Sequence, residues 1–109
     1  MAGFTRNWAS EGAKTNPLAG DVLADTGPMV EGTYKYYVCA GCTVAGVLNI
    51  QWRDSTNASN VLEHVLPLAA GQEICFDVDM FVVQTDERLR ITARNNIVGS
   101  TQITVYIKA

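Results

Sequence analysis

Charged residues, histidine and long apolar runs are scarce in this sequence, and each scarcity excludes a class of protein. Charged residues make up 17% of the 109 residues while apolar residues make up 48%, a balance unlike that of disordered chains. The net charge of −3 offers no electrostatic match to a phosphate backbone, so no nucleic-acid partner is expected. No run of about 18 apolar residues is present, so no membrane-spanning helix is expected either.

The N-terminal segment has no regular pattern. Its first residues lack the apolar core of a secretory signal peptide, which favours folding in a reducing cytoplasm. Residues 1–19 show neither strand alternation nor a sustained helical stripe, and we predict an N-terminal arm there. Phe4 and Trp8 need a surface to cover them, either their own domain or a neighbouring chain. Together with Arg6, they are the residues that we expect to contact a neighbouring chain.

Residues 20–109 consist of short segments separated by turn residues. In residues 46–53, Leu48, Ile50 and Trp52 alternate with polar residues, as in a strand with one buried face. This spacing, without any helical stripe, predicts an all-β fold: a single antiparallel β-sandwich or jelly-roll-like domain of seven or eight strands. The expected strands are 21–24, 33–39, 46–53, 61–66, 73–78, 88–94 and 101–108, and the apolar stretch 80–83 is either buried on both sides or crosses between sheets.

The three cysteines leave several interpretations open. Cys39 and Cys42 form a C-x-x-C pair, and Cys75 and the single His64 could complete a zinc site, although only the first spacing fits. A redox pair would need a helix after the motif, where the sequence predicts another strand. A disulfide is a further alternative. Packing as small buried or half-buried residues is the favoured interpretation, so we expect no cofactor and no metal.

No catalytic constellation stands out, and we predict that the protein is not an enzyme. A Ser-His-Asp site would have to use His64, which lies in the middle of a predicted strand. Asp77 and Asp79 could flank a glycosidic bond, but solvent-facing acids on a sheet look the same. Arg88, Arg90 and Arg94 line the polar face of another strand. If that strand neighbours the one carrying Asp77 and Asp79, cross-strand ion pairs follow; otherwise one of the two faces is a candidate subunit contact.

The order of the segments resembles that of small β-sandwich structural proteins of tailed bacteriophages, of the capsid decoration, cement or head-fibre type. The resemblance implies a decoration protein that binds and stabilises the phage head. Its partners would be the major capsid protein and itself, with a homotrimer favoured, and Phe4, Arg6 and Trp8 of the arm would contact a capsid subunit or a neighbouring protomer. It would lie on the capsid surface of the virion after synthesis in the host cytoplasm. The segments that carry the resemblance are Val22–Gly27, Glu31–Tyr34, Ile50–Asn60, Leu66–Gln72, Asp86–Ile91 and Gly99–Gln102.

The alternative is a carbohydrate-binding or receptor-binding β-sandwich module of a phage tail or head fibre, with a host-surface glycan as its ligand. Such a module uses exposed aromatic side chains, and the candidates are Tyr34, Tyr36, Tyr37 and Trp52. Strand alternation places Tyr34 and Tyr36 on one face and Tyr37 on the other, so only part of this group can be exposed.

Overall fold

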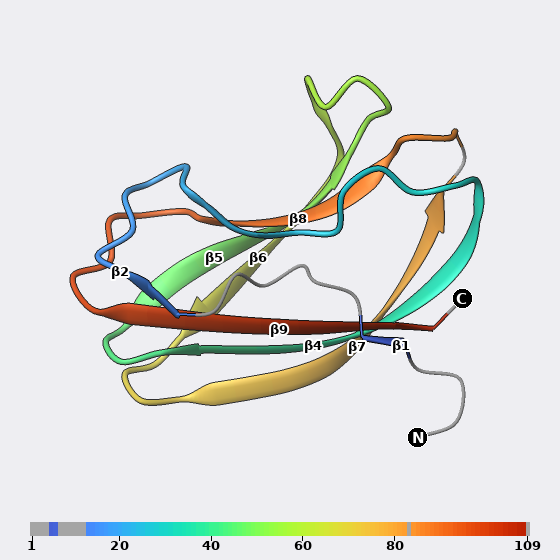
Figure 1. The fold of residues 1–109 in the computed structure, drawn as a ribbon. Coiled ribbons are helices and arrows are strands. Elements are labelled where there is room, and N and C mark those ends of the chain that lie inside the picture. The colour runs from blue at the N-terminus through green and yellow to red at the C-terminus, as the bar shows by residue number, and fades with distance from the viewer. Residues whose placement is uncertain (1–4, 7–12, 83, 109) are drawn as a thin grey trace.

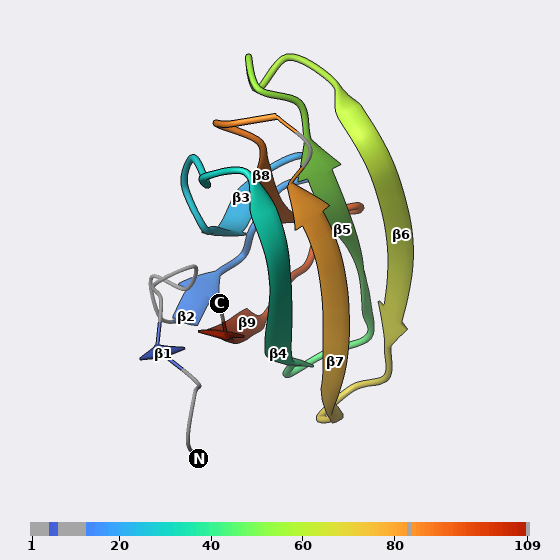
Figure 2. The same cartoon turned by 90° about the vertical axis from the view of Figure 1, so that its right-hand side faces the viewer.

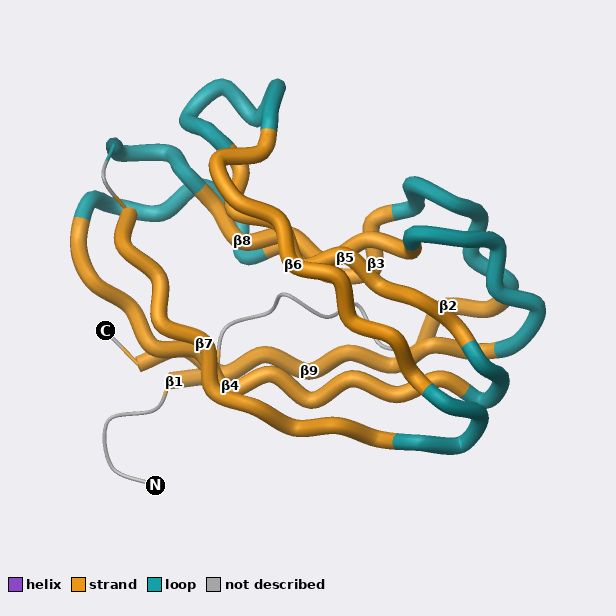
Figure 3. The backbone as a smooth tube through the Cα atoms, turned by 180° about the vertical axis from the view of Figure 1, so that it is seen from behind, coloured by secondary structure: helices purple, strands orange, loops and turns teal. Residues whose placement is uncertain are grey.

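The chain folds as two antiparallel β-sheets that face each other (Figure 1). The computed structural model describes residues 5–6, 13–82 and 84–108. Within these ranges there are nine strands and no helix (Figure 3), hence none able to span a membrane. The strands are β1 (Thr5–Arg6), β2 (Ala13–Thr15), β3 (Val22–Asp25), β4 (Gly32–Cys42), β5 (Gly46–Arg53), β6 (Asn60–Leu68), β7 (Glu73–Val82), β8 (Arg88–Ala93) and β9 (Ser100–Lys108).

The predicted β-sandwich is confirmed. One sheet has five strands in the order β1-β9-β4-β7, with β2 also paired to β9, and the other has four strands in the order β3-β8-β5-β6. Figure 2 shows the two sheets as separate layers, with β4 and β7 side by side in one and β5 and β6 side by side in the other. Each sheet therefore has one face toward the core and one outer face.

Strand alternation builds the core between the sheets. In β5, Leu48 and Ile50 are buried, and their register partners on β8 are Ala93 and Ile91, which are buried as well. Val38 of β4 approaches from the five-stranded sheet and is fully buried. Successive side chains of a strand point to opposite faces of the sheet. The residues between these buried apolar residues therefore point to the outer face.

The strand bounds differ from the predictions in several places, and β7 is the most informative of them. The described residues form nine strands where seven or eight were predicted, and β4 extends over Gly32–Cys42 where 33–39 was predicted. β5 has the predicted bounds, whereas the predicted segment 73–78 and residues 80–82 of the apolar stretch belong to the single strand β7. Residues 80–82 do not cross between sheets, because β7 pairs with β4 without a register shift from Glu73, opposite Gly41, to Val82, opposite Gly32. Val83 lies outside the described residues. Continuous pairing to one long partner explains why the apolar run stays in the same sheet.

Two pieces of the predicted N-terminal arm pair with β9. Thr5 and Arg6 of β1 lie opposite Ile107 and Tyr106, and β2 pairs with the first half of β9. Phe4 and Trp8 lie outside the described residues, and the structure gives only the backbone of Arg6. Contact of these three residues with a capsid subunit or a neighbouring protomer stays a prediction.

Candidate functional site

The outer face of the four-stranded sheet carries an ordered set of long polar side chains. In β5, Asn49, Gln51 and Arg53 alternate with the core residues and point away from them. Their register partners on β8 are Thr92, Arg90 and Arg88. We call this surface the arginine–amide face; its members are Asp25, Asn49, Gln51, Arg53, Glu63, Arg88, Arg90 and Arg94.

A row of hydrogen bonds crosses this face from β8 to β6. The Nε of Arg90 donates to Oε1 of Gln51 at 2.9 Å, and the Nε2 of Gln51 donates to Oε2 of Glu63 at 2.9 Å. Both ends of the Gln51 amide are therefore engaged, and its side chain is only 7% exposed. The row holds the Arg90 guanidinium in one orientation, because a planar guanidinium with one fixed nitrogen presents its remaining donors in a fixed fork.

A second row lies toward the other end of the face. The NH1 of Arg94 donates to Oδ1 of Asn49 at 3.2 Å and lies 3.7 Å from Oε1 of Glu63. Arg94 is half-exposed, so this ion pair is screened by solvent and contributes little to stability. At this end of the face the positive charge of Arg94 is therefore paired with the carboxylate of Glu63.

Arg53 is held by the turn that follows β5. Its guanidinium donates to Oδ1 of Asn57 at 2.9 Å, to the Asn57 carbonyl at 2.6 Å and to Oδ1 of Asn60 at 2.7 Å. Asn57 has a φ of 58°, a left-handed conformation that asparagine tolerates better than most residues. All these acceptors are neutral, so the positive charge of Arg53 is hydrogen-bonded but not neutralised by them.

The same turn is organised by Asp54. Its carboxylate accepts hydrogen bonds from the Ala58 backbone N–H at 2.9 Å, the Ser59 hydroxyl at 2.9 Å and the Thr56 hydroxyl at 3.1 Å. Hydrogen bonds to the charged form favour ionisation; chiefly through the Ala58 N–H, they lower the pKa of Asp54 from 3.8 to about 2. The turn that positions Arg53 is thus itself held by a carboxylate that stays ionised.

Positive charge is in excess around Arg88. Arg53 and Arg88 are directly opposite each other in the β5–β8 register, and Arg90 is two residues from Arg88. The carboxylate paired with Arg88 is that of Asp25, whose Oδ2 lies 3.6 Å from NH1 of Arg88. The Nε of Arg88 is buried, and no described residue hydrogen-bonds it. Burial, followed by the charge of Arg53, lowers the pKa of Arg90 despite the opposing effect of Asp25.

The cross-strand ion pairs expected if the strand of Arg88 and Arg90 neighboured that of Asp77 and Asp79 do not form, and the alternative, a subunit contact on one of the two faces, stays a prediction. Arg88 and Arg90 lie on β8 in the four-stranded sheet, whereas Asp77 and Asp79 lie on β7 in the five-stranded sheet. The carboxylates that meet the arginines are instead those of Asp25 and Glu63. These two acids stand in different strands far apart in sequence, and only the sheet order β3-β8-β5-β6 brings them to one face.

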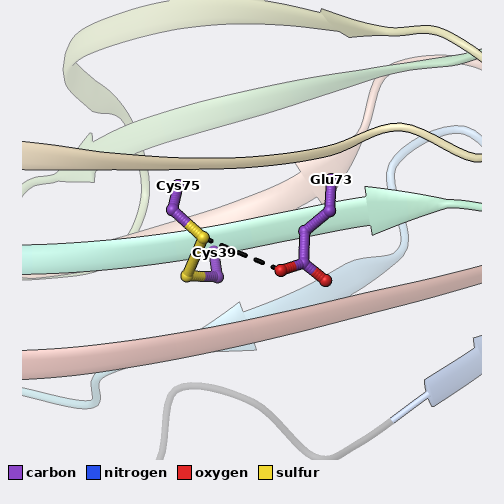
Figure 4. The surroundings of a disulfide bond; sticks show 3 residues. All are labelled: Cys39, Glu73 and Cys75. Carbon is purple, nitrogen blue, oxygen red and sulfur yellow. Dashed lines mark hydrogen bonds between the residues drawn. A yellow bond between two sulfur atoms is a disulfide. The ribbon is translucent and has the colours of Figure 1, made fainter.

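The outer face of the five-stranded sheet carries a disulfide between Cys39 and Cys75 (Figure 4). These residues are opposite each other in the β4–β7 register, with their Cα atoms 4.1 Å apart. The Sγ of Cys75 lies 3.8 Å from Oε1 of Glu73. Because a disulfide sulfur has no proton to donate, we regard this as a contact rather than a hydrogen bond.

The disulfide decides among the interpretations of the cysteines. Packing was the favoured one; it is wrong for Cys39 and Cys75 and holds for Cys42, which is 4% exposed and part of the core. Cys39 and Cys42 are three residues apart on one strand, so alternation sends them to opposite faces. The zinc set is not assembled either, since His64 is exposed on β6 of the other sheet and two of the sulfurs are bonded to each other. Of the described residues, Cys39, Glu73 and Cys75 are the closest grouping of metal-ligand types.

Of the four predicted aromatic candidates, the structure describes the side chains of Tyr37 and Trp52. Tyr37 is 38% exposed and shares the outer parity of Cys39 on β4. Trp52 is half-buried and packs against the core, so it is not an exposed platform. The side chains of Tyr34 and Tyr36 lie outside what the structure describes. The arginine–amide face was missed by sequence reasoning because its residues come from four strands.

Comparison with known proteins gives structural matches only. No protein-family model matches the chain, and no curated protein sequence matches it. The fold is similar to a carbohydrate binding module (CBM6cm-2) from the Cellvibrio mixtus lichenase 5A in complex with cellotriose, with a TM-score of 0.56 and 13% identity over 99% of this chain and 88% of that one.

Two further solved structures are similar to nearly the same extent. The CBM22-1 xylan-binding domain from Paenibacillus barcinonensis Xyn10C has a TM-score of 0.59 and 8% identity, covering 99% of this chain and 82% of that one. A module described as BiXyn10A CBM1 has a TM-score of 0.56 and 11% identity, covering 97% of this chain and 96% of that one. At these identities the likeness establishes a shared β-sandwich fold.

Proposed function

We propose that this chain is a carbohydrate-binding β-sandwich module that binds its ligand on the arginine–amide face. The similar solved structures support the proposal, since one is in complex with cellotriose and another is described as a xylan-binding domain. The observation that carries it is the row Arg90–Gln51–Glu63, which places guanidinium, amide and carboxylate groups side by side on the outer face of the four-stranded sheet.

This surface has the chemistry that sugar hydroxyls require. A hydroxyl both donates and accepts, so neighbouring hydroxyls are best met by alternating donors and acceptors. Among the described residues, the side chain of Arg90 uses only its Nε in a hydrogen bond, which leaves its two terminal nitrogens to donate to a ligand. Because Gln51 and Glu63 are already held in place, little side-chain freedom is lost on binding, and this preorganisation favours affinity.

The role that we infer is binding rather than catalysis. The matched regions of the similar structures are described as binding modules, and some such modules are attached to enzymes, as in a xylanase whose CBM22-1 and GH10 modules were solved together. The present chain spans 25% of that longer chain. We therefore assign the proposed sugar contact to recognition.

The capsid-decoration reading receives no support from these structural neighbours, which favour its carbohydrate-binding alternative. A major capsid protein partner, a homotrimer and a location on the virion surface stay predictions from the resemblance of segment order. A glycan-binding module of a phage tail or head fibre would reconcile that resemblance with the present proposal.

The test is glycan binding by the purified chain and by two matched variants. Arg90→Gln changes the arginine–amide face, whereas Tyr37→Ala changes the outer face of the other sheet. We expect a glycan array, followed by calorimetry on the best ligand, to show binding that Arg90→Gln weakens about tenfold or more and Tyr37→Ala leaves unchanged. The opposite pattern would move the site to the five-stranded sheet, and the absence of any glycan ligand would refute the function.

A further inference from the structure

We infer that the arginine–amide face selects anionic sugars, that is, sugars carrying a carboxylate or a sulfate ester. This inference rests on the proposed function and names its ligand class. It starts from an imbalance of charge: four arginines, at positions 53, 88, 90 and 94, share this face with two carboxylates, those of Asp25 and Glu63. The chain as a whole has a net charge of −3, so the excess of positive charge is local.

The excess lies at one end of the face. Glu63 pairs with Arg94 at 3.7 Å, and its other oxygen accepts from Nε2 of Gln51 and from Nδ2 of Asn60 at 3.0 Å, so its ion pair among the described residues is at the Arg94 end. At the other end, Arg53 has only neutral hydrogen-bond acceptors, and Asp25 stands alone beside Arg88 and Arg90. Asp25 also accepts a hydrogen bond from the Gly27 N–H at 2.8 Å, which occupies its other oxygen.

The pairing of the strands makes this imbalance unfavourable without an anion. Like charges directly opposite each other on neighbouring strands repel, and Arg53 and Arg88 occupy such a pair of positions. Arg53 is only 9% exposed, so water screens its charge weakly. A bound anion would lower this repulsion, whereas a neutral sugar would leave it in place.

The exposed parts of the arginines suit such a ligand. The side chain of Arg88 is 18% exposed and that of Arg90 is partly exposed, so both can reach a ligand that lies on the sheet. A guanidinium fork binds a carboxylate or a sulfate through two parallel N–H···O bonds. Arg53 is too deeply placed for this and acts through its charge. We therefore place the anionic group over Arg88 and Arg90.

The experiment compares acidic and neutral forms of the same polymers by calorimetry. Polygalacturonate is paired with its fully methyl-esterified form, and dextran sulfate with dextran. We expect at least about tenfold tighter binding of one acidic polymer than of its neutral counterpart, and a weakening of that binding as salt rises from about 0.05 M to about 0.5 M. The polymer that shows the preference distinguishes carboxylate from sulfate.

Three variants locate the effect. Arg90→Gln is expected to abolish the preference, and Lys35→Gln, which removes an exposed cation from β4 in the other sheet, to retain it. Asp25→Asn removes the counter-charge beside Arg88 while its side-chain oxygen can still accept from Gly27, so it is expected to strengthen binding of the acidic polymer. This gain keeps the test valid if Arg90→Gln does not fold.

The outcomes separate this inference from the proposed function. Equal binding of acidic and neutral polymers would overturn the anionic preference and leave the carbohydrate-binding function standing. Binding of neither kind would refute both. If Lys35→Gln lost the preference as fully as Arg90→Gln, the attraction would be a diffuse charge effect, and the assignment of the site to Arg88 and Arg90 would be wrong.

Discussion

Replacing the disulfide is expected to destabilise the sandwich strongly. Cys39 and Cys75 are 36 residues apart in sequence, and the loop that they close contains β5 and β6. Cross-linking a loop of this length restricts the unfolded chain by an entropy equivalent to about 4 kcal/mol at 25 °C. The double variant Cys39→Ala/Cys75→Ala should lose about that much free energy of unfolding.

The size of the effect makes it easy to measure. For a domain of this length, each 1 kcal/mol corresponds to roughly 4 °C in Tm, so we expect the melting temperature to fall by roughly 15–20 °C. Urea unfolding followed by circular dichroism should show a lower midpoint for the double variant, and for the wild-type chain in reductant.

A matched control uses the same reductant on the double variant, where it should have no effect. Cys42 has no disulfide partner, so any residual effect of reductant would indicate that Cys42 is also involved. If the oxidised wild type and the double variant unfold at the same urea midpoint, the loop-closure argument is refuted. Mass spectrometry of the unreduced protein should find Cys39 linked to Cys75 and not to Cys42.

The remaining predictions concern single side chains. Because the folded pKa of Asp54 is about 2 and its usual value is 3.8, the stability that its charge provides is present above about pH 4 and is lost as the pH falls through 2. In Asp54→Asn, the urea unfolding midpoint should therefore depend less on pH over that range. Gly46→Ala would place a Cβ 2.9 Å from Cδ1 of the buried Ile97 and should lower the free energy of unfolding, measured by urea titration, by about 1–3 kcal/mol. The comparison variant is Gly71→Ala, whose added Cβ meets nothing within 4 Å, so that its cost reports only the strain of an alanine at a φ of 71°. Burial raises the pKa of the Cys42 thiol above 9.0, so a thiol reagent at pH 8 should find no reactive thiol in the folded protein and one after unfolding; rapid reaction in the native state would contradict its place in the core.

The strands could be predicted from sequence because their signal is local. β5 shows its alternation within eight residues, and the bounds of 46–53 follow from it directly. The partners of each strand depend instead on sheet order, which local alternation does not contain. For this reason the prediction missed the Cys39–Cys75 disulfide, which requires β4 beside β7.

The placement of Cys39 and Cys42 on opposite faces of the sheet could have been predicted from the sequence. Cys39 and Cys42 are an odd number of residues apart, so their presence in one strand already places them on opposite faces. The predicted strand ended at residue 39, whereas β4 continues to Cys42, and that difference hid the argument. The arginines at 88 and 90 were correctly placed on one polar face, but their partners Asp25 and Glu63 were not, because Asp25 was assigned to the turn after the strand 21–24 and Glu63 to no site.

The disulfide also determines how the chain would respond to a pulling force. β1 pairs with the end of β9 at Arg6 and Tyr106, so a force that separates these two strands at their outer ends loads the hydrogen bonds one pair at a time rather than all at once. Once the sheets have opened, the bond between Cys39 and Cys75 still holds together the two ends of the segment that contains β5 and β6. Those 36 residues correspond to about 120 Å of extended chain. The pulling force cannot extend this segment until the disulfide is reduced.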